Sequence, residues 1–279
     1  MPGLAKVAAI VAALLTGSAT ACLATDPPER RLVEIENPLA NSQPLQGYLR
    51  QPRDAGALPA VVLLHGCSGG WRQLDERWGK LIASWGYVTL TVDRFGPRGL
   101  SSTCTGGPPP ATVFDAYRAL AFLVQQPFVD RDRVAVIGFS QGGLLALTSV
   151  ERGIIERASS DKFHAAIAFY PPCLGIKDSM TVPTLILIGE LDDWTLAKEC
   201  RNLVEGRDDY GISRQKDLGI PIEFIVYPGA YHAFDVPSLA TPEQFLGHRL
   251  EFNQAARDQS VDAVRKFLYA IIGGQEKLQ

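Results

Sequence analysis

Ser140 lies between two glycines in the segment GFSQG, residues 138–142. It follows the apolar run RVAVIGF, and LLALTSV comes shortly after it. A strand, a sharp turn and a helix in this order lift a serine hydroxyl above a sheet, because flanking glycines let the two backbones pass close together. The first N–H groups of the helix then face developing negative charge. The pattern predicts nucleophilic catalysis by Ser140, with a solvated serine in a glycine-rich turn as the alternative.

Such a serine needs a base, and the chain contains four histidines. His164 precedes an apolar run and should fall at the opposite edge of the sheet, while His248 lies in EQFLGHRLEF, which we expect to be a helix or an ordered loop. His65 ends an apolar run and is expected to hold the next loop in shape. His232 follows EFIVYP and completes the chain order Ser, acid, His. We therefore predict His232 as the base, a histidine that caps local backbone being the alternative.

The imidazole needs a carboxylate that fixes its tautomer and stabilises the cation formed in the reaction. The apolar run TLILIG is followed by Glu190, Leu191, Asp192 and Asp193. We predict that Asp192 is the orienting acid. Asp193 and Glu190 are the alternatives, and Asp193 could instead cap a helix that begins near Thr195.

A tetrahedral intermediate also needs two hydrogen-bond donors for its oxyanion. One should be the backbone N–H of Gln141, at the start of the helix after the serine. The other should come from the loop His65-Gly66-Cys67, where the backbone N–H of Cys67 is the expected donor.

Short apolar runs alternate along the chain with helical patterns, which predicts an α/β fold with a mostly parallel sheet and helices on both faces. In such a sheet the reactive loops lie at the carboxyl ends of the strands. The first two strands should form an antiparallel edge, and the loops 94–110 and 233–254 are candidate pocket walls. The expected strands are 32–36, 45–50, 60–65, 87–93, 133–139, 165–170, 184–189 and 223–228, and the expected helices are 74–85, 111–126, 142–153, 195–210 and 255–272.

Composition favours one large core. The chain has 279 residues, of which 46% are hydrophobic, and we expect a single domain over residues 26–279. The formal net charge of −3, without a run of Lys and Arg, argues against nucleic acid as a partner. No cofactor motif occurs, and no cysteine or histidine spacing indicates a metal site. The sequence does not indicate an oligomeric state.

The first 25 residues have the features of a signal peptide. Lys6 precedes the short apolar stretch VAAIVAALL, and small residues follow at Ala19 and Ala21. The stretch is short for a permanent membrane span. We expect export, to the periplasm or the medium. ATAC also resembles a lipobox, so that lipid attachment at Cys22, and with it a membrane anchor, is the alternative.

Export would place the remaining cysteines in an oxidising compartment. Cys67 and Cys104 belong to loops at the carboxyl ends of adjacent strands, while Cys173 follows one strand and Cys200 opens the helix after the next strand. Neighbouring loops can bring Cα atoms within disulfide range. We therefore expect the disulfides Cys67–Cys104 and Cys173–Cys200, with four buried free thiols as the alternative.

From about residue 32 to residue 270 the chain resembles the dienelactone hydrolase family of α/β-hydrolases. This resemblance implies the α/β-hydrolase fold, hydrolysis of esters or lactones, and the roles of Ser140, Asp192 and His232. It also favours Asp192 over Asp193, because the acid of the pattern stands three residues after Gly189. The resemblance is carried by HGCSGG (65–70), DRFGPRG (93–99), GFSQGG (138–143), GELDDWT (189–195) and YPGAYHAFD (227–235).

The chain departs from that family at its nucleophile. The well-known members carry a cysteine where Ser140 stands, and a glutamate in the loop that here reads His-Gly-Cys-Ser. We therefore expect a serine carboxylesterase acting on small-molecule esters or lactones. An acetyl-xylan-type esterase, a peptidase of the same fold, and a non-catalytic binding protein are the alternatives.

Few residues bear on the substrate. Arg94 and Arg98 could bind a substrate carboxylate, or could pair with a structural aspartate such as Asp93 or Asp115. Trp194 could line an apolar acyl pocket, together with other aromatic residues near the site, or could serve ordinary packing. Those other residues are Phe139, Tyr170, Tyr231 and Phe234.

Overall fold

The computed structural model describes residues 29–36, 43–53, 56–177, 179–212 and 219–274. The expected signal peptide, residues 1–25 with Cys22, lies outside them. Among the described helices, none is long and apolar enough to cross a membrane.

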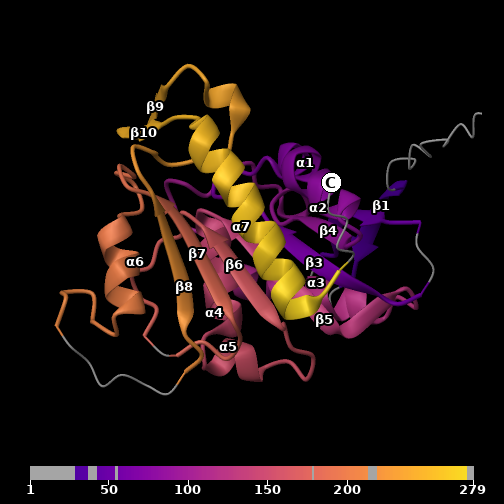
Figure 1. Ribbon diagram of the computed structural model, residues 1–279. Coiled ribbons are helices and arrows are strands. Elements are labelled where there is room, and N and C mark those ends of the chain that lie inside the picture. The colour runs from indigo at the N-terminus through magenta and orange to yellow at the C-terminus, as the bar shows by residue number, and fades with distance from the viewer. Residues whose placement is uncertain (1–28, 37–42, 54–55, 178, 213–218, 275–279) are drawn as a thin grey trace, which may run out of the picture.

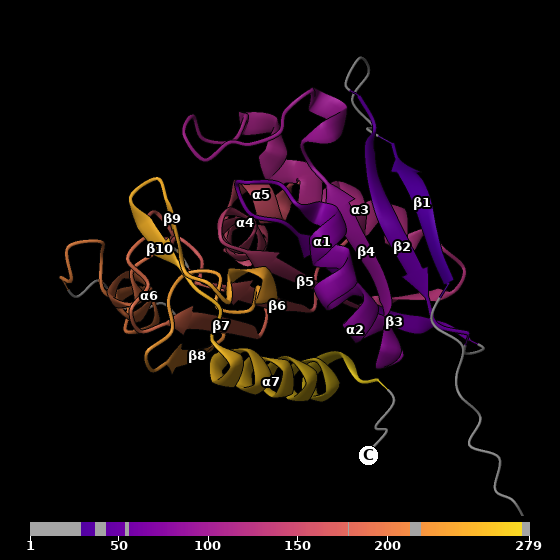
Figure 2. The same cartoon turned by 90° about the horizontal axis from the view of Figure 1, so that it is seen from above.

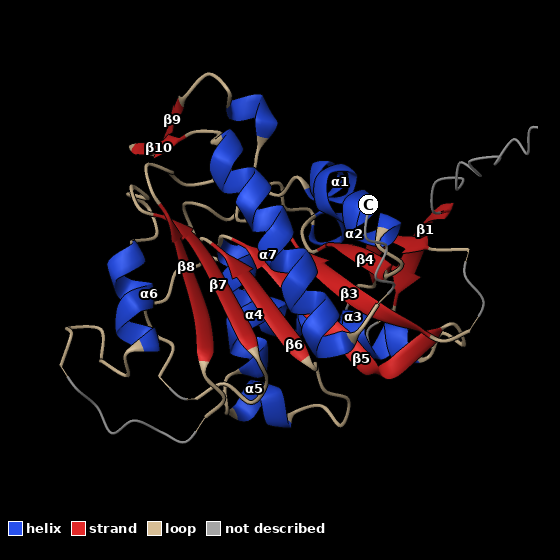
Figure 3. Cartoon of the chain, in the orientation of Figure 1, coloured by secondary structure: helices blue, strands red, loops and turns tan. Residues whose placement is uncertain are grey.

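An eight-stranded sheet forms the centre of the fold, in the order β1-β2-β4-β3-β5-β6-β7-β8 (Figures 1 and 3). Strands β1 and β2 pair antiparallel, β2 pairs antiparallel with β4, and all further pairs are parallel. The mostly parallel sheet and its antiparallel edge are as the sequence predicts. The strands are β1 (Glu29–Ile35), β2 (Leu45–Gln51), β3 (Leu58–Leu64), β4 (Val88–Asp93), β5 (Val129–Phe139), β6 (Ala165–Phe169), β7 (Thr184–Gly189) and β8 (Ile222–Tyr227).

Helices cover both faces of the sheet. Figure 2 shows α7 along one face and α3, α4 and α5 on the other. Strands β3, β4, β6 and β7 are buried along their whole length, which explains their continuous apolar sequences. The helices are α1 (Trp71–Leu74), α2 (Lys80–Ser84), α3 (Asp115–Val124), α4 (Gln141–Val150), α5 (Ile154–Arg157), α6 (Ala197–Val204) and α7 (Gln254–Ile272), with 3-10 turns at Gly96–Arg98, Pro110–Phe114 and Pro237–Leu239.

The expected helix 74–85 contains a π-helical turn, Asp75–Gly79, between α1 and α2. Asp75 is fully buried, and its carboxylate accepts hydrogen bonds from the Arg50 guanidinium at 2.6 and 3.1 Å. A Cβ at Gly79 would lie 2.5 Å from Asp75 Oδ1, so the glycine leaves room for this ion pair. The π-helical turn therefore accommodates the buried ion pair of Arg50 and Asp75, which the spacing of apolar residues in the sequence does not indicate.

Two sequence expectations about the last third of the chain are wrong. The helix expected over 195–210 is limited to α6, since the chain turns away after Val204. His248 lies neither in a helix nor in an ordered loop. It begins β10 (His248–Leu250), which pairs with β9 (Glu243–Phe245) in a hairpin beyond the upper ends of β7 and β8 (Figure 1). This hairpin belongs to the segment 233–254 that we expected beside the site.

Candidate active site

Ser140 occupies the turn between β5 and α4 with φ 54° and ψ −119°, a strained conformation for a residue with a side chain. Its N–H donates to the carbonyl of Phe169 at 2.9 Å. A Cβ at Gly142 would lie 2.2 Å from the Leu64 carbonyl oxygen, and one at Gly138 would lie 1.9 Å from the Gly142 carbonyl oxygen. Only glycine fits at these two positions, which is why the turn can form here.

His232 lies between the serine and an aspartate. Its Nε2 is 3.1 Å from Ser140 Oγ, and its Nδ1 is 2.8 Å from Asp192 Oδ2. Both His232 and Asp192 are 3% exposed, whereas Ser140 is partly exposed. With its Nδ1–H donated to the carboxylate, the imidazole presents the Nε2 lone pair to the serine hydroxyl, which is the arrangement that proton abstraction requires.

The loop after β7 fixes the Asp192 carboxylate through three further donors. Its Oδ1 accepts the backbone N–H groups of Trp194 at 3.0 Å and Thr195 at 2.9 Å, and its Oδ2 accepts the Thr195 hydroxyl at 2.9 Å. The Thr195 hydroxyl also lies 3.2 Å from His232 Nδ1. Sequence reasoning missed Thr195 as part of this group, although it is the last residue of the GELDDWT motif.

The alternative acids face elsewhere. Asp193 accepts the backbone N–H of Arg249, in the β9–β10 hairpin, at 3.2 and 3.3 Å. It does not cap a helix, because α6 begins at Ala197 and has no side-chain cap. Glu190 is exposed and accepts the N–H of Gly229 at 3.0 Å. Asp192 is thus the aspartate that contacts the imidazole.

The loop after β3 passes beside the serine. A Cβ at Gly66 would lie 3.4 Å from the Cβ of Ser140 and 4.0 Å from its Oγ. Gln141 is the first residue of α4, and the first N–H groups of a helix have no partner within it. The next residue of the β3 loop, Cys67, accepts the Thr103 N–H at 2.8 Å through its carbonyl oxygen. The β3 loop and the start of α4 thus approach the serine from two separate elements.

The disulfide Cys67–Cys104 joins this loop to the long segment 94–110. Thr103, the residue before Cys104, donates its hydroxyl to Gln141 Oε1 at 2.9 Å. Segment 94–110 therefore contacts both the β3 loop and the start of α4, where the two expected oxyanion donors lie. This pairing is the one that neighbouring strand ends predict.

The His65 side chain contacts both the β3 loop and the backbone that follows β4. Its Nδ1 lies 2.8 Å from the Gly66 carbonyl oxygen, and its Nε2 accepts the Arg94 N–H at 3.2 Å. Burial, followed by the charge of Arg94, holds the pKa of His65 well below its usual value. The ring is therefore neutral, which agrees with the expectation that it holds the loop in shape.

The two arginines considered for substrate binding have other partners. Arg94 is fully buried and donates from its guanidinium to the His65 carbonyl oxygen. Burial lowers the pKa of Arg94 to about 10, so that it remains charged at neutral pH. Arg98 pairs with both oxygens of Asp115, at 2.7 and 2.8 Å. Both side chains are engaged in holding segment 94–110, and Arg94 is buried in this structure.

Aromatic side chains surround the imidazole. The Trp194 ring, partly exposed, lies 5.1 Å from the His232 ring and stacks on His248 at 5.0 Å with planes 8° apart. The Tyr170 ring is buried and lies 4.6 Å from the His232 ring. The other three aromatic residues considered as pocket lining differ in exposure, with Phe139 and Phe234 buried and Tyr231 partly exposed.

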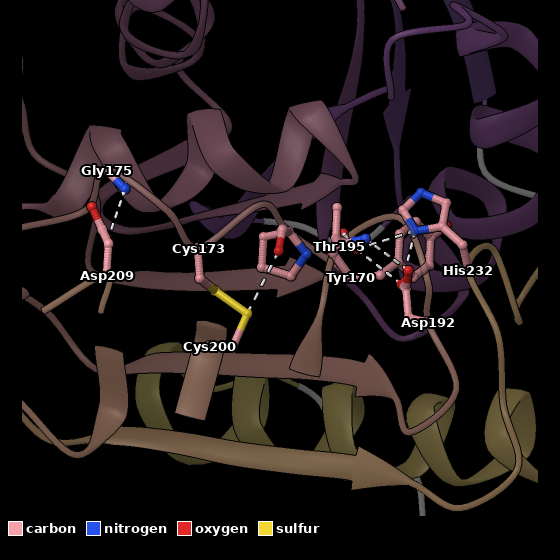
Figure 4. The surroundings of a disulfide bond; sticks show 9 residues. Tyr170, Cys173, Gly175, Asp192, Thr195, Cys200, Asp209 and His232 are labelled. Atoms are coloured by element: carbon pink, nitrogen blue, oxygen red, sulfur yellow. Dashed lines mark hydrogen bonds and ion pairs between the residues drawn. A yellow bond between two sulfur atoms is a disulfide. The ribbon is translucent and has the colours of Figure 1, made fainter. Parts of the chain in front are cut away.

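The second disulfide, Cys173–Cys200, lies to the left of Thr195, Tyr170 and His232 in Figure 4. It joins the segment that follows β6 to α6, and Cys200 Sγ lies 3.5 Å from the Pro171 carbonyl oxygen. The same two segments meet at the site itself, where the Thr195 hydroxyl oxygen lies 3.0 Å from the Tyr170 carbonyl oxygen. The disulfide therefore fastens the acid loop to the segment beside the histidine.

A cavity of about 150 Å³ lies elsewhere, among residues of α3, α4 and α5 such as Tyr117, Ser149 and Glu156. It adjoins neither the serine nor the imidazole. Within the described part of the chain, no group of three or more His, Cys, Asp and Glu residues could hold a metal ion.

Comparison with known proteins adds a family and a fold. The model of the dienelactone hydrolase family matches residues 45–272. Acylamino-acid-releasing enzyme 2 of Oryza sativa subsp. japonica is 25% identical over 182 residues, which cover 62% of this chain and 21% of that protein. The chain thus spans about a fifth of that relative's length.

Two solved structures illustrate the shared α/β-hydrolase fold. A dienelactone hydrolase-like promiscuous phosphotriesterase from metagenomic libraries has a TM-score of 0.70 and 21% identity, over 89% of this chain and all of the other. Thermogutta terrifontis esterase 2, phosphoramylated by tabun, has a TM-score of 0.64 and 20% identity, over 90% of this chain and 98% of the other.

Proposed function

The chain belongs to the dienelactone hydrolase family, and we propose that it is a carboxylic ester hydrolase that acts through an acyl-enzyme on Ser140, with His232 as base and Asp192 as orienting acid. The observation that carries this proposal is the continuous path of hydrogen bonds from Ser140 Oγ to His232 Nε2 and from His232 Nδ1 to Asp192 Oδ2, at 3.1 and 2.8 Å. A strained serine at a strand-to-helix turn supports it further.

In the first half of the reaction, Ser140 Oγ attacks the ester carbonyl carbon while His232 Nε2 takes its proton. The oxyanion of the tetrahedral intermediate accepts hydrogen bonds from the backbone N–H groups of Gln141 and Cys67. The C–O bond to the leaving alcohol then breaks, and the imidazolium returns the proton to that oxygen. A lactone would keep its alcohol tethered to the acyl group.

In the second half, water attacks the acyl carbonyl while His232 again takes a proton. The same two N–H groups stabilise the second oxyanion, and collapse releases the carboxylic acid and restores the Ser140 hydroxyl. Asp192 keeps the proton of His232 on Nδ1 in both halves of the reaction, because its carboxylate is itself held by two backbone N–H groups and a hydroxyl.

The serine nucleophile supports ordinary carboxylic esters as substrates in place of dienelactone itself. The experiment that tests the function is labelling with a fluorophosphonate, followed by a panel of esters with graded acyl length. Covalent labelling of Ser140 and turnover of at least part of the panel are expected. A folded protein that neither reacts nor turns over any ester would contradict the proposal.

Release of an acylated amino acid is a second candidate, favoured by the match to acylamino-acid-releasing enzyme 2. Acyl-amino-acid anilides measured beside the matching esters distinguish the two functions. A ratio of kcat/KM that favours the anilide would support the second candidate.

We expect the disulfide Cys67–Cys104 to support activity by tethering the oxyanion loop. Replacing both cysteines with alanine should lower kcat about tenfold, because the Cys67 N–H would lose its fixed position. The loss of stability should be roughly 4 kcal/mol for a sequence separation of 37 residues. The measurements are kcat well below the unfolding temperature and thermal unfolding by circular dichroism. An unchanged kcat in the folded double variant would show that the tether plays no part in catalysis.

We also propose export. Two disulfides in the described residues are consistent with an oxidising compartment, and the segment 1–25 has the pattern of a signal peptide. Mass spectrometry of protein from the native host should find a mature N-terminus near residues 22–26. A diacylglyceryl mass on Cys22 would support lipid attachment instead, and full-length protein in the cytoplasm would refute export.

A further inference from the structure

We propose that Tyr170 is a positioning residue for the reaction, and that its ring, polarised by the Asp235 carboxylate, stabilises the imidazolium form of His232. The inference rests on the proposed role of His232 as the base. It gives a function to a tyrosine that lies outside the path from serine to aspartate.

The backbone of Tyr170 is strained and firmly held. Its φ is 36°, in the left-handed region that a bulky side chain rarely adopts. Its N–H donates to the Leu187 carbonyl at 2.6 Å, and its carbonyl oxygen lies 3.0 Å from the Thr195 hydroxyl oxygen. Strain of this kind persists where surrounding contacts over-determine a conformation, and such positions cluster at functional sites. The conformation brings the Tyr170 ring against the imidazole (Figure 4).

A buried carboxylate fixes the far end of the same side chain. The Tyr170 hydroxyl donates to Asp235 Oδ1 at 2.6 Å, and Asp235 Oδ2 accepts Trp78 Nε1–H at 2.7 Å. The Asp235 side chain is fully buried, and its cationic partner Arg77 lies at 3.3 Å. Burial, and after it the charge of Asp235, raises the pKa of Tyr170 well above its usual value. The hydroxyl therefore stays protonated and donates to the carboxylate.

This arrangement favours a positive charge on the imidazole. The face of an aromatic ring attracts a cation, more strongly where water is excluded. A hydrogen bond donated to a carboxylate polarises the phenol and makes that face more negative. The two rings are 4.6 Å apart and tilted by 58°. In the active form of the enzyme His232 is a cation only after it has taken the serine proton, so that the attraction acts on the transition state and not on the neutral imidazole.

Other groups face the imidazole, and none of them duplicates this role. Asp192 and Thr195 lie at Nδ1, and Ser140 lies at Nε2. The Trp194 ring also packs on His232, but a second imidazole, that of His248, stacks on it. The further ring contacts of Tyr170 are with phenylalanines, namely Phe139, Phe169 and Phe234. Among these ring contacts, His232 is the partner of Tyr170 that can carry a positive charge.

The test uses the pH dependence of two rates, fluorophosphonate labelling of Ser140 and kcat for one ester. Tyr170→Leu removes the ring, and Tyr170→Phe keeps the ring but loses the hydroxyl. Tyr227→Leu is the matched control, because Tyr227 is also buried at a strand end and its ring contacts Phe234. KM is measured in parallel to separate substrate binding from chemistry.

Tyr170→Leu is expected to lower the plateau of both rates about tenfold. It should also move the acidic limb of both pH–rate profiles to lower pH, because the His232 imidazolium is then less stable and forms only at lower pH. Tyr170→Phe should shift the limb in the same direction by less, and Tyr227→Leu should leave it in place. A purely structural role would lower the plateau, or the fraction of active protein, without moving the limb.

An unmoved limb in folded Tyr170→Leu overturns the inference, as does an equal shift in Tyr227→Leu. If Tyr170→Leu fails to fold, Tyr170→Phe and Asp235→Asn decide, and the inference fails if neither moves the limb. Failure of the proposed function has a different signature, because wild-type protein would then not be labelled at Ser140 at all.

Discussion

Replacing Ser140 with alanine is expected to lower kcat for ester hydrolysis by roughly 10⁴- to 10⁶-fold. The substitution removes the attacking oxygen and nothing else, since Ser140 is partly exposed and its hydroxyl contacts His232 Nε2 at 3.1 Å. The turn that carries it is set by Gly138 and Gly142, which remain. The variant should therefore fold and bind substrate as before, with KM little changed.

Ser149 provides the matched control for this experiment. It is fully buried in α4, the helix that follows Ser140, and its hydroxyl donates to the Leu145 carbonyl at 2.7 Å, remote from the imidazole. Ser149→Ala should keep wild-type kcat and fluorophosphonate labelling, whereas Ser140→Ala should lose both. Wild-type-like turnover by a folded Ser140→Ala protein would place the chemistry at another residue.

The roles expected of Ser140 and His232 could be read from the sequence because each depends on local features. The serine turn lies between a continuous apolar strand and a helix, and glycines mark it on both sides. The histidine was singled out by its place after a strand and by chain order. In a parallel sheet these features meet at one edge, so that topology alone brings distant segments together. The disulfide pairing followed from the same argument.

Contacts that depend on tertiary packing could not be read in this way. Nothing local to Asp235 indicates that it would be buried under Trp78 and Tyr170, far away in the chain. The hairpin that contains His248 was also missed, because its two strands have three residues each and little apolar alternation. For Arg94 the sequence left a structural role and a substrate role open, and its burial, which depends on tertiary packing, favours the structural role.

Asp192→Asn is expected to lower kcat by roughly 10³- to 10⁴-fold, whereas Asp193→Asn should change it by less than about threefold. The Asp192 carboxylate accepts Nδ1–H of His232 at 2.8 Å and is fully enclosed by its other donors. An amide turned to keep the donors of the 194–195 backbone would present its NH₂ group to the imidazole. The ring would then carry its proton on Nε2 and could not accept the serine proton.

Asp193 is the control that the chain itself offers, one residue away with the same side chain. Its carboxylate is about half exposed and accepts the Arg249 N–H at 3.2 Å, a bond that an asparagine oxygen can still accept. Its other neighbour is His248 Nδ1, at 3.7 Å. The measurement is kcat across pH for both variants, with thermal unfolding to show that each is folded. If Asp193→Asn were instead the variant with the large loss of kcat, the Asp193 carboxylate would have to contact His232 during catalysis. The assignment of Asp192 would then be wrong.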